Sequence, residues 1–124
     1  MLKSAMSLRC HVAKAAFAAA LTFIATPASA DFGCPVRPSE YLGVDGGGFL
    51  VLIGGKHVKV CSFQGNAGDA SPDICKIWYS HVATARAQGK TVNFLFHETQ
   101  SGGATSCSTL QDWALTPPYF LETY

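Results

Sequence analysis

The stretch from Ser71 to His97 constrains the fold more than any other part of the chain, because the spacing of its apolar residues changes within it. Up to Gln88 they recur every three or four positions, which is the period of a helix with one apolar face. From Thr91 onward they alternate with more polar residues, as in a half-buried strand. We therefore expect an amphipathic helix that packs on a sheet to which the following strand belongs.

Both ends of this helix carry sequence signals. Ser71 supplies an N-cap side chain, Pro72 is tolerated in a first turn, and Asp73 complements the positive end of the helix dipole. Gly89 can adopt the left-handed conformation that ends a helix. The residues expected on the buried stripe are Ile74, Ile77, Trp78, His81, Val82 and Ala85.

The first 30 residues have the features of a secretory signal peptide. Three basic residues precede an apolar run from Ala15 to Ile24, and a small-x-small motif ends at Ala30. A membrane anchor is the alternative, but it needs about 20 apolar residues, more than this run contains. We expect residues 1–30 to be removed and residues 31–124 to form a single exported domain, periplasmic or secreted, with no membrane span.

Four cysteines remain in residues 31–124: Cys34, Cys61, Cys75 and Cys107. An even number in a small exported domain indicates two disulfides, for which three pairings exist. We favour Cys61–Cys75, because it ties the strand before the helix to the first helical turn, and Cys34–Cys107 then follows. A zinc site needs closely spaced cysteine pairs, which the chain lacks. We expect no metal and no other cofactor.

The rest of the chain predicts short strands separated by turns. Besides the strand at 91–97, strands are expected at 40–44, 49–53, 57–63 and 119–123, and residues 31–38, with two prolines, are expected to be irregular. Glycine-rich turns join the first three. About five strands with one helix after the third predict an α+β domain with a small curled antiparallel sheet, in the element order of an OB-fold.

The charged residues argue against nucleic acid as a partner. Once residues 1–30 are removed, six basic residues remain against eight acidic ones, and they form no basic patch. His57 lies between lysines and is expected to be exposed, and His81 lies on the helix stripe and is expected to be partly buried. His97 precedes Glu98 as in a zinc-protease motif, but no second histidine follows at the required spacing.

The sequence predicts no catalytic residues. It has no Gly-x-Ser-x-Gly motif, and all four cysteines of residues 31–124 are assigned to disulfides. We therefore expect that the protein is not an enzyme. A hydrolase remains the alternative, and it would require a cleft that holds His81 or His97 next to an acid.

Aromatic residues are the remaining candidates for a binding surface. Trp113 and Tyr119 lie near loops and prolines, where their rings could stack on a sugar. Packing in the core is the ordinary alternative for both, and it is the one we favour for Trp78 on the helix. Trp113 and Tyr119 are therefore the candidate ligand-binding residues.

Several segments carry a resemblance to known proteins. They are Tyr41–Gly48, Val60–Cys61, Cys75–Tyr79, Ala87–Val92, Cys107–Trp113 and Pro117–Glu122. Together they span nearly all of residues 31–124 and resemble a set of small exported bacterial proteins to which no activity is assigned. More distantly, the layout resembles the B subunits of AB5 toxins of the pertussis and subtilase-cytotoxin kind. Those proteins share a disulfide near a long helix that begins with a tryptophan, and a strand directly after it.

The resemblance to toxin B subunits implies an OB-fold, assembly into rings of five and binding of glycans. The loops do not correspond, so no sugar-contacting residue is carried over. We therefore expect an exported binding module whose ligand is a glycan and which forms a homo-oligomer. The alternative is a monomeric periplasmic accessory or inhibitor protein that binds another envelope protein.

Overall fold

The computed structural model describes residues 31–124, and the expected signal peptide lies outside them. Six strands and one long helix follow one another as β1 (Asp31–Val36), β2 (Leu42–Asp45), β3 (Gly48–Ile53), β4 (Lys56–Ser62), α1 (Pro72–Ala87), β5 (Val92–His97) and β6 (Phe120–Thr123). Two short 3₁₀ turns, η1 (Glu98–Gln100) and η2 (Cys107–Thr109), separate β5 from β6. The fold is therefore α+β, as predicted.

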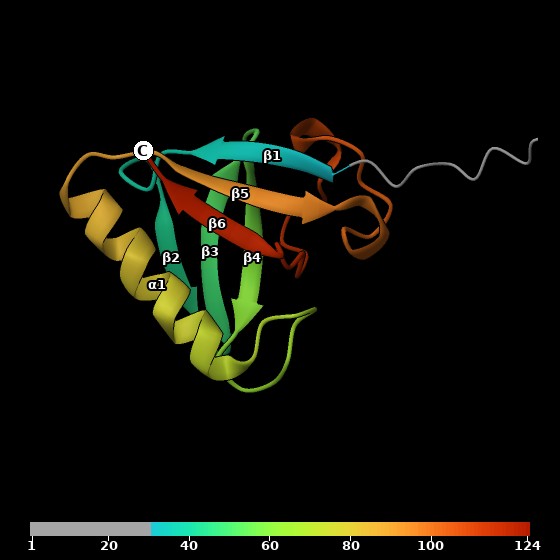
Figure 1. Cartoon of the computed structure of the whole chain (residues 1–124), viewed down its shortest axis with the longest axis horizontal. Helices are drawn as coiled ribbons and strands as arrows, with labels where there is room; N and C mark the ends of the chain where they lie inside the picture. The colour runs from blue at the N-terminus through green and yellow to red at the C-terminus, as the bar shows by residue number, and fades with distance from the viewer. Residues whose placement is uncertain (1–30) are drawn as a thin grey trace, which may run out of the picture.

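The strands form two antiparallel sheets of three strands each, in the orders β1–β5–β6 and β2–β3–β4. The strands of one sheet cross those of the other at a large angle (Figure 1), a common way to pack two twisted sheets. The core between them is formed by alternate residues of both: Cys34, Val36, Val92, Phe94 and Phe96 from one sheet, and Phe49, Val51, Ile53, Val58 and Val60 from the other.

Residues 31–36 correct the predicted strand count. They form β1, which pairs along its whole length with β5, so the chain has six strands and the helix follows the fourth strand. The prediction of an irregular segment rested on proline. However, β1 lies at the edge of its sheet, and an edge strand tolerates a proline whose missing N–H would have faced away from the neighbouring strand.

The other elements lie within two residues of their predicted bounds. The hydroxyl oxygen of Ser71 accepts a hydrogen bond from the Ile74 N–H at 3.3 Å and caps α1, and Gly89 follows the helix with a φ of 67°. Gly54 and Gly55 both have positive φ, as a tight hairpin turn between β3 and β4 requires.

The helix buries a narrower face than predicted. Val82 and Ala85 are buried, but Ile74 and Ile77 are 38% and 52% exposed, and His81 is also exposed. The cause is Cys75, which points toward β4 because of its disulfide and brings only residues three, four and seven positions later to the same face. Half of the predicted stripe is therefore exposed to solvent.

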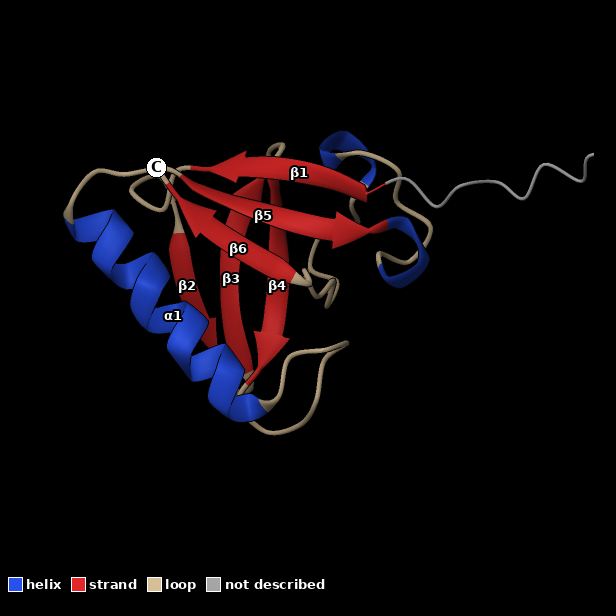
Figure 2. Ribbon diagram, in the orientation of Figure 1, coloured by secondary structure: helices blue, strands red, loops and turns tan. Residues whose placement is uncertain are grey.

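Both predicted disulfides are present. Cys61–Cys75 joins β4 to the first turn of α1, and Cys34–Cys107 joins β1 to η2, each with a Cα–Cα distance of 5.6 Å. Figure 2 shows α1 at one end of the molecule and both 3₁₀ turns at the other. The two disulfides thus fasten the helix at one end and the long β5–β6 connection at the other.

The segment between η2 and β6 links the two sheets. Leu115 forms a parallel bridge with Lys59 of β4: the Lys59 N–H donates to the Ala114 carbonyl, and the Thr116 N–H donates to the Lys59 carbonyl. The chain then continues as β6 beside β5. The outer edge of β4 is thereby partly covered, and the C-terminal segment contacts both sheets.

Candidate functional site

The outer face of the β2–β3–β4 sheet carries a second, smaller apolar layer. Leu50 is only 2% exposed although it lies outside the core between the sheets, because it alternates with Phe49 and Val51. Its neighbours in register on this face are Gly43 and Lys59. A residue that is buried on an outer face must be covered by side chains from neighbouring strands.

Tyr41 supplies part of this cover by lying over Gly43. A Cβ atom at residue 43 would come within 2.5 Å of the Tyr41 hydroxyl oxygen, so only glycine leaves room for the ring. The edge of the Tyr41 ring meets His57 at a centroid distance of 4.7 Å and an interplanar angle of 81°. Such edge-to-face contacts are a favoured arrangement of aromatic rings.

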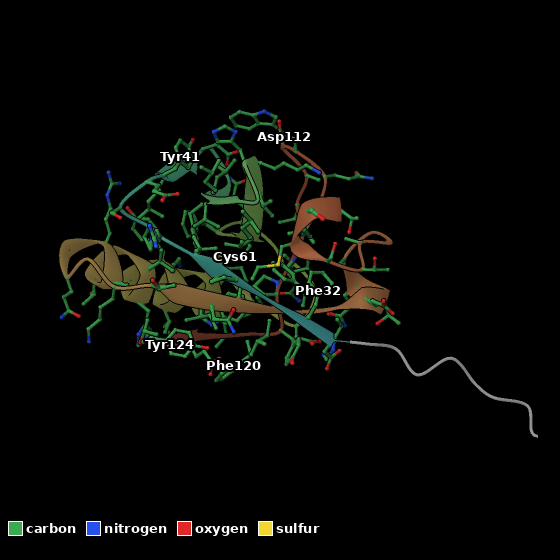
Figure 3. The ribbon with its side chains drawn as sticks, turned by 90° about the horizontal axis from the view of Figure 1, so that it is seen from above. Phe32, Tyr41, Cys61, Asp112, Phe120 and Tyr124 are labelled. Atoms are coloured by element: carbon green, nitrogen blue, oxygen red, sulfur yellow. A yellow bond between two sulfur atoms is a disulfide. The ribbon has the colours of Figure 1, made fainter. Side chains whose placement is uncertain are left out.

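Trp113 also packs on the ring of His57. Its indole stacks on the His57 imidazole at a centroid distance of 4.5 Å and an interplanar angle of 14°, and it remains 63% exposed. We call Tyr41, His57 and Trp113 the aromatic platform. Figure 3 shows Tyr41 and Asp112, the residue before Trp113, together at one edge of the molecule. The platform is therefore a surface feature with an indole as its most exposed part.

Backbone contacts hold Trp113 in place. The Trp113 N–H donates to the His57 carbonyl at 2.7 Å, and the His57 N–H donates to Asp112 Oδ1 at 2.7 Å. Lys56 Nζ donates to the carbonyls of Ser108 and Leu110, both at 2.7 Å. Trp113 itself has a φ of 59°, a conformation that costs a bulky residue about 1–3 kcal/mol. The surrounding bonds offset this strain and keep the indole outward.

Charged groups flank the platform. The Asp112 carboxylate is half exposed, with Oδ1 at 3.6 Å from His57 Nδ1. In the next row of the same face, Lys59 Nζ lies 2.6 Å from Asp45 Oδ2, and Leu115 is exposed beside Lys59. The hydrogen bond from Lys59 lowers the pKa of Asp45 below its ordinary value of 3.8. An apolar surface bordered by hydrogen-bonding carboxylates can bind a ligand that has both apolar and hydroxyl-bearing faces.

The Asp45–Lys59 pair gives a prediction for the pH dependence of stability. Because the pKa of Asp45 is lowered in the folded state, its contribution is complete above pH 3.8 and is lost as the pH falls through the folded pKa. In a Lys59→Gln variant, the midpoint of the Asp45 carboxyl, followed by carbon NMR, should rise toward 3.8. Lys76→Gln, which removes the partner of Asp73, is the control. An unchanged midpoint in Lys59→Gln would show that the pair does not set this pKa.

A second stack lies on the other sheet. The Tyr119 ring lies on His97 at a centroid distance of 3.8 Å and an interplanar angle of 9°, and His97 Nδ1 is 2.6 Å from Asp31 Oδ1. Partial burial raises the pKa of Tyr119, and the Asp31 carboxylate raises it further. The hydrolase alternative required a cleft that holds His81 or His97 next to an acid, and His97 lies next to Asp31. Asp31 and His97 are also directly opposed in the β1–β5 register, so the pair fastens the start of β1 to the end of β5.

The structure does not bring the two predicted ligand-binding residues together. Trp113 stacks on His57 of β4 and Tyr119 stacks on His97 of β5. Their sequence neighbours Asp112 and Phe120 lie at opposite edges of the molecule in Figure 3. The residues that accompany Trp113 are instead Tyr41 and His57. His57 was predicted to be exposed, but it is half buried because Tyr41 and Trp113 cover its ring.

A groove lies between α1 and β6. One part, of about 300 Å³, is lined by Ile77, Trp78, His81, Phe120, Leu121, Glu122 and Thr123. An adjoining part, of about 260 Å³, is lined by Ser80, His81, Thr84, Ala85, Gln88, Lys90 and Thr123. His81 and Thr123 line both, so the two parts adjoin, and we call them together the α1–β6 groove.

Within residues 31–124, no three metal-ligating side chains are grouped so that they could hold a metal ion. In the same range, no helix has the length and apolar character needed to cross a membrane. The chain matches none of the protein-family models, curated proteins or solved structures with which it was compared.

Proposed function

We propose that this chain is an exported, non-catalytic module that binds carbohydrate through the aromatic platform. The observation that carries this proposal is the conformation of Trp113. The chain places its bulkiest side chain at positive φ, cushions one face on His57 and leaves the indole 63% exposed. Strain of this kind is retained mainly at functional sites, since folding alone gains nothing from an indole turned toward water.

The chemistry of the platform suits a pyranose ring. The face of a sugar that carries its axial hydrogens is apolar and packs on an indole, while its rim of hydroxyl groups needs hydrogen-bond acceptors. The Asp112 carboxylate beside Trp113 is such an acceptor. The rigid mounting of Trp113 lowers the entropic cost of binding, because the side chain does not need to be ordered by the ligand.

We also propose that the domain is OB-like and related to toxin B subunits. The crossed sheets, the helix fastened by a cystine and the parallel bridge between Lys59 and Leu115 support a partly closed barrel. Export to an oxidising compartment is supported by the two disulfides in a small domain. The Asp31–His97 pair joins paired strands, which supports a structural role for this histidine.

A glycan array tests the proposed function. Residues 31–124 with both disulfides intact would be labelled and applied to the array alongside the Trp113→Ala variant. Binding to a defined set of sugars that the variant loses is the expected result. Absence of any bound glycan, or equal binding by the variant, would contradict the proposal. Capture of an envelope protein by both forms would then favour the accessory-protein alternative.

A further inference from the structure

The outer edge of β6 is open. β6 is the last strand in the order β1–β5–β6, and within residues 31–124 no other strand pairs with its outer side. An open edge presents backbone N–H and carbonyl groups that can pair with another extended chain. β6 and α1 point toward the same end of the molecule (Figure 1), and residues of both line the α1–β6 groove.

The α1–β6 groove changes character along its length. At one end it is lined by Ile77, Trp78 and Leu121. Ile77 is 52% exposed because the Cys61–Cys75 disulfide fixes the rotation of the helix with another face toward the core. At the other end it is lined by Lys90, Gln88 and hydroxyl side chains, with His81 between the two ends. An occupant with separate apolar and hydrogen-bonding parts would match both ends.

The charge of the groove is unbalanced. Among residues 31–124, no carboxylate forms an ion pair with Lys90, and none lines the part of the groove that contains it. Glu122 lines the apolar part, but its carboxylate accepts hydrogen bonds from Asn93 at 3.1 Å and Tyr124 at 2.8 Å. The positive charge of Lys90 therefore selects a negatively charged group in the occupant.

We propose that the α1–β6 groove binds an extended, acidic segment of a partner protein, which adds to the sheet as a strand beside β6. Antiparallel addition is the more stable arrangement, and it would place an acidic side chain near Lys90, followed by apolar side chains at alternate positions near Ile77 and Leu121. A segment of about five residues spans roughly 15 Å, the length of α1 from Ile77 to its end at Ala87, just before Lys90.

The two tryptophans of the chain separate this site from the aromatic platform. Trp78 lines the α1–β6 groove, whereas Trp113 belongs to the platform. The probe is the peptide acetyl-Thr-Glu-Thr-Val-Thr-Val-Thr-amide, added to residues 31–124 labelled with nitrogen-15. The indole N–H signal of Trp78 should shift and that of Trp113 should not. The backbone amide hydrogens of β6 should also exchange more slowly with solvent when the peptide is bound.

Matched variants test each part of the groove. Ile77→Asn should weaken peptide binding about tenfold. Ile74→Asn, at the other exposed isoleucine of α1, should leave it unchanged because Ile74 does not line the groove. A peptide with lysine in place of glutamate should bind about fivefold more weakly. A peptide with proline in place of the central valine should not bind, because proline cannot complete the strand.

Several results would overturn the proposal while leaving the platform untouched. One is the absence of a Trp78 shift at millimolar peptide. Others are equal binding of the glutamate and lysine peptides, or an unchanged affinity in Ile77→Asn. Light scattering decides whether a second copy fills the groove: Ile77→Asn is expected to leave the oligomeric state unchanged, and an oligomer that this variant dissociates would assign the groove to another copy of the chain.

Discussion

Replacement of Cys34 and Cys107 together by alanine should lower the free energy of unfolding by about 4 kcal/mol. This disulfide closes a loop across a sequence separation of 73 residues, so its loss frees much of the unfolded chain. A small domain has a total stability of about 5–15 kcal/mol, which makes this change a large part of it. Urea denaturation at neutral pH, followed by circular dichroism, measures the loss.

Loss of Cys34–Cys107 and loss of Cys61–Cys75 should destabilise different parts of the fold. β1 is an edge strand that is fastened by Cys34 at its middle and by Asp31 at its start, so its amide hydrogens should exchange fastest in the Cys34→Ala, Cys107→Ala variant. In the matched Cys61→Ala, Cys75→Ala variant, the first turn of α1 should be affected instead. A change of less than about 1 kcal/mol in the first variant would contradict the role given to this disulfide.

The Trp113→Ala variant should bind the glycans selected on the array at least about 30-fold more weakly than the wild type. The reason is that the exposed indole provides most of the apolar contact area of the aromatic platform. Trp113→Phe should retain part of the affinity, because a smaller ring can still stack on His57 and on a sugar. Isothermal titration calorimetry with the strongest hit measures all three proteins.

Trp113→Gly separates binding from folding. Glycine adopts a φ of 59° without strain, so this variant should remain within about 1 kcal/mol of wild-type stability while it loses glycan binding. Trp78→Phe is the control for a tryptophan outside the platform. If Trp113→Gly kept wild-type affinity, the indole would not contact the ligand and the proposed function would fail. If the variant unfolded the domain, the indole would have a structural role instead.

Local signals in the sequence predicted the helix, its caps and most strands, because short-range physics decides them. The Ser71 cap, the Gly54–Gly55 turn and the alternation of Val92, Phe94 and Phe96 needed no knowledge of distant residues. The disulfide pairing also followed from local geometry, since Cys75 lies in the first turn of a helix that begins shortly after the strand with Cys61.

The errors arose where distant residues decide the outcome. Pro35 argued against a strand, but β5 supplied a partner on the side that proline leaves intact. Ile77 belonged to the apolar stripe, but a disulfide fixed the rotation of the helix and exposed it. The contact between Tyr41 and His57 could have been derived from the two hairpin turns, because their lengths set the register of β2 and β4 on β3.

The position of Trp113 could not have been derived in this way. It depends on the parallel bridge between Lys59 and Leu115, two residues with no local relation in the sequence. Its positive φ carries no sequence signal either, since tryptophan rarely adopts that conformation. Hairpin geometry therefore predicts the contact between Tyr41 and His57, whereas only the folded chain reveals the position of Trp113.

The central claim is that a rigidly presented indole contacts the ligand, and the two tryptophan indole signals test it most directly. Nitrogen-15-labelled residues 31–124 would be titrated with the strongest soluble glycan from the array, and Trp78→Phe would assign the signals. We predict that the Trp113 signal shifts and saturates while the Trp78 signal remains in place. A Trp113 signal that does not move at saturating sugar would contradict the account.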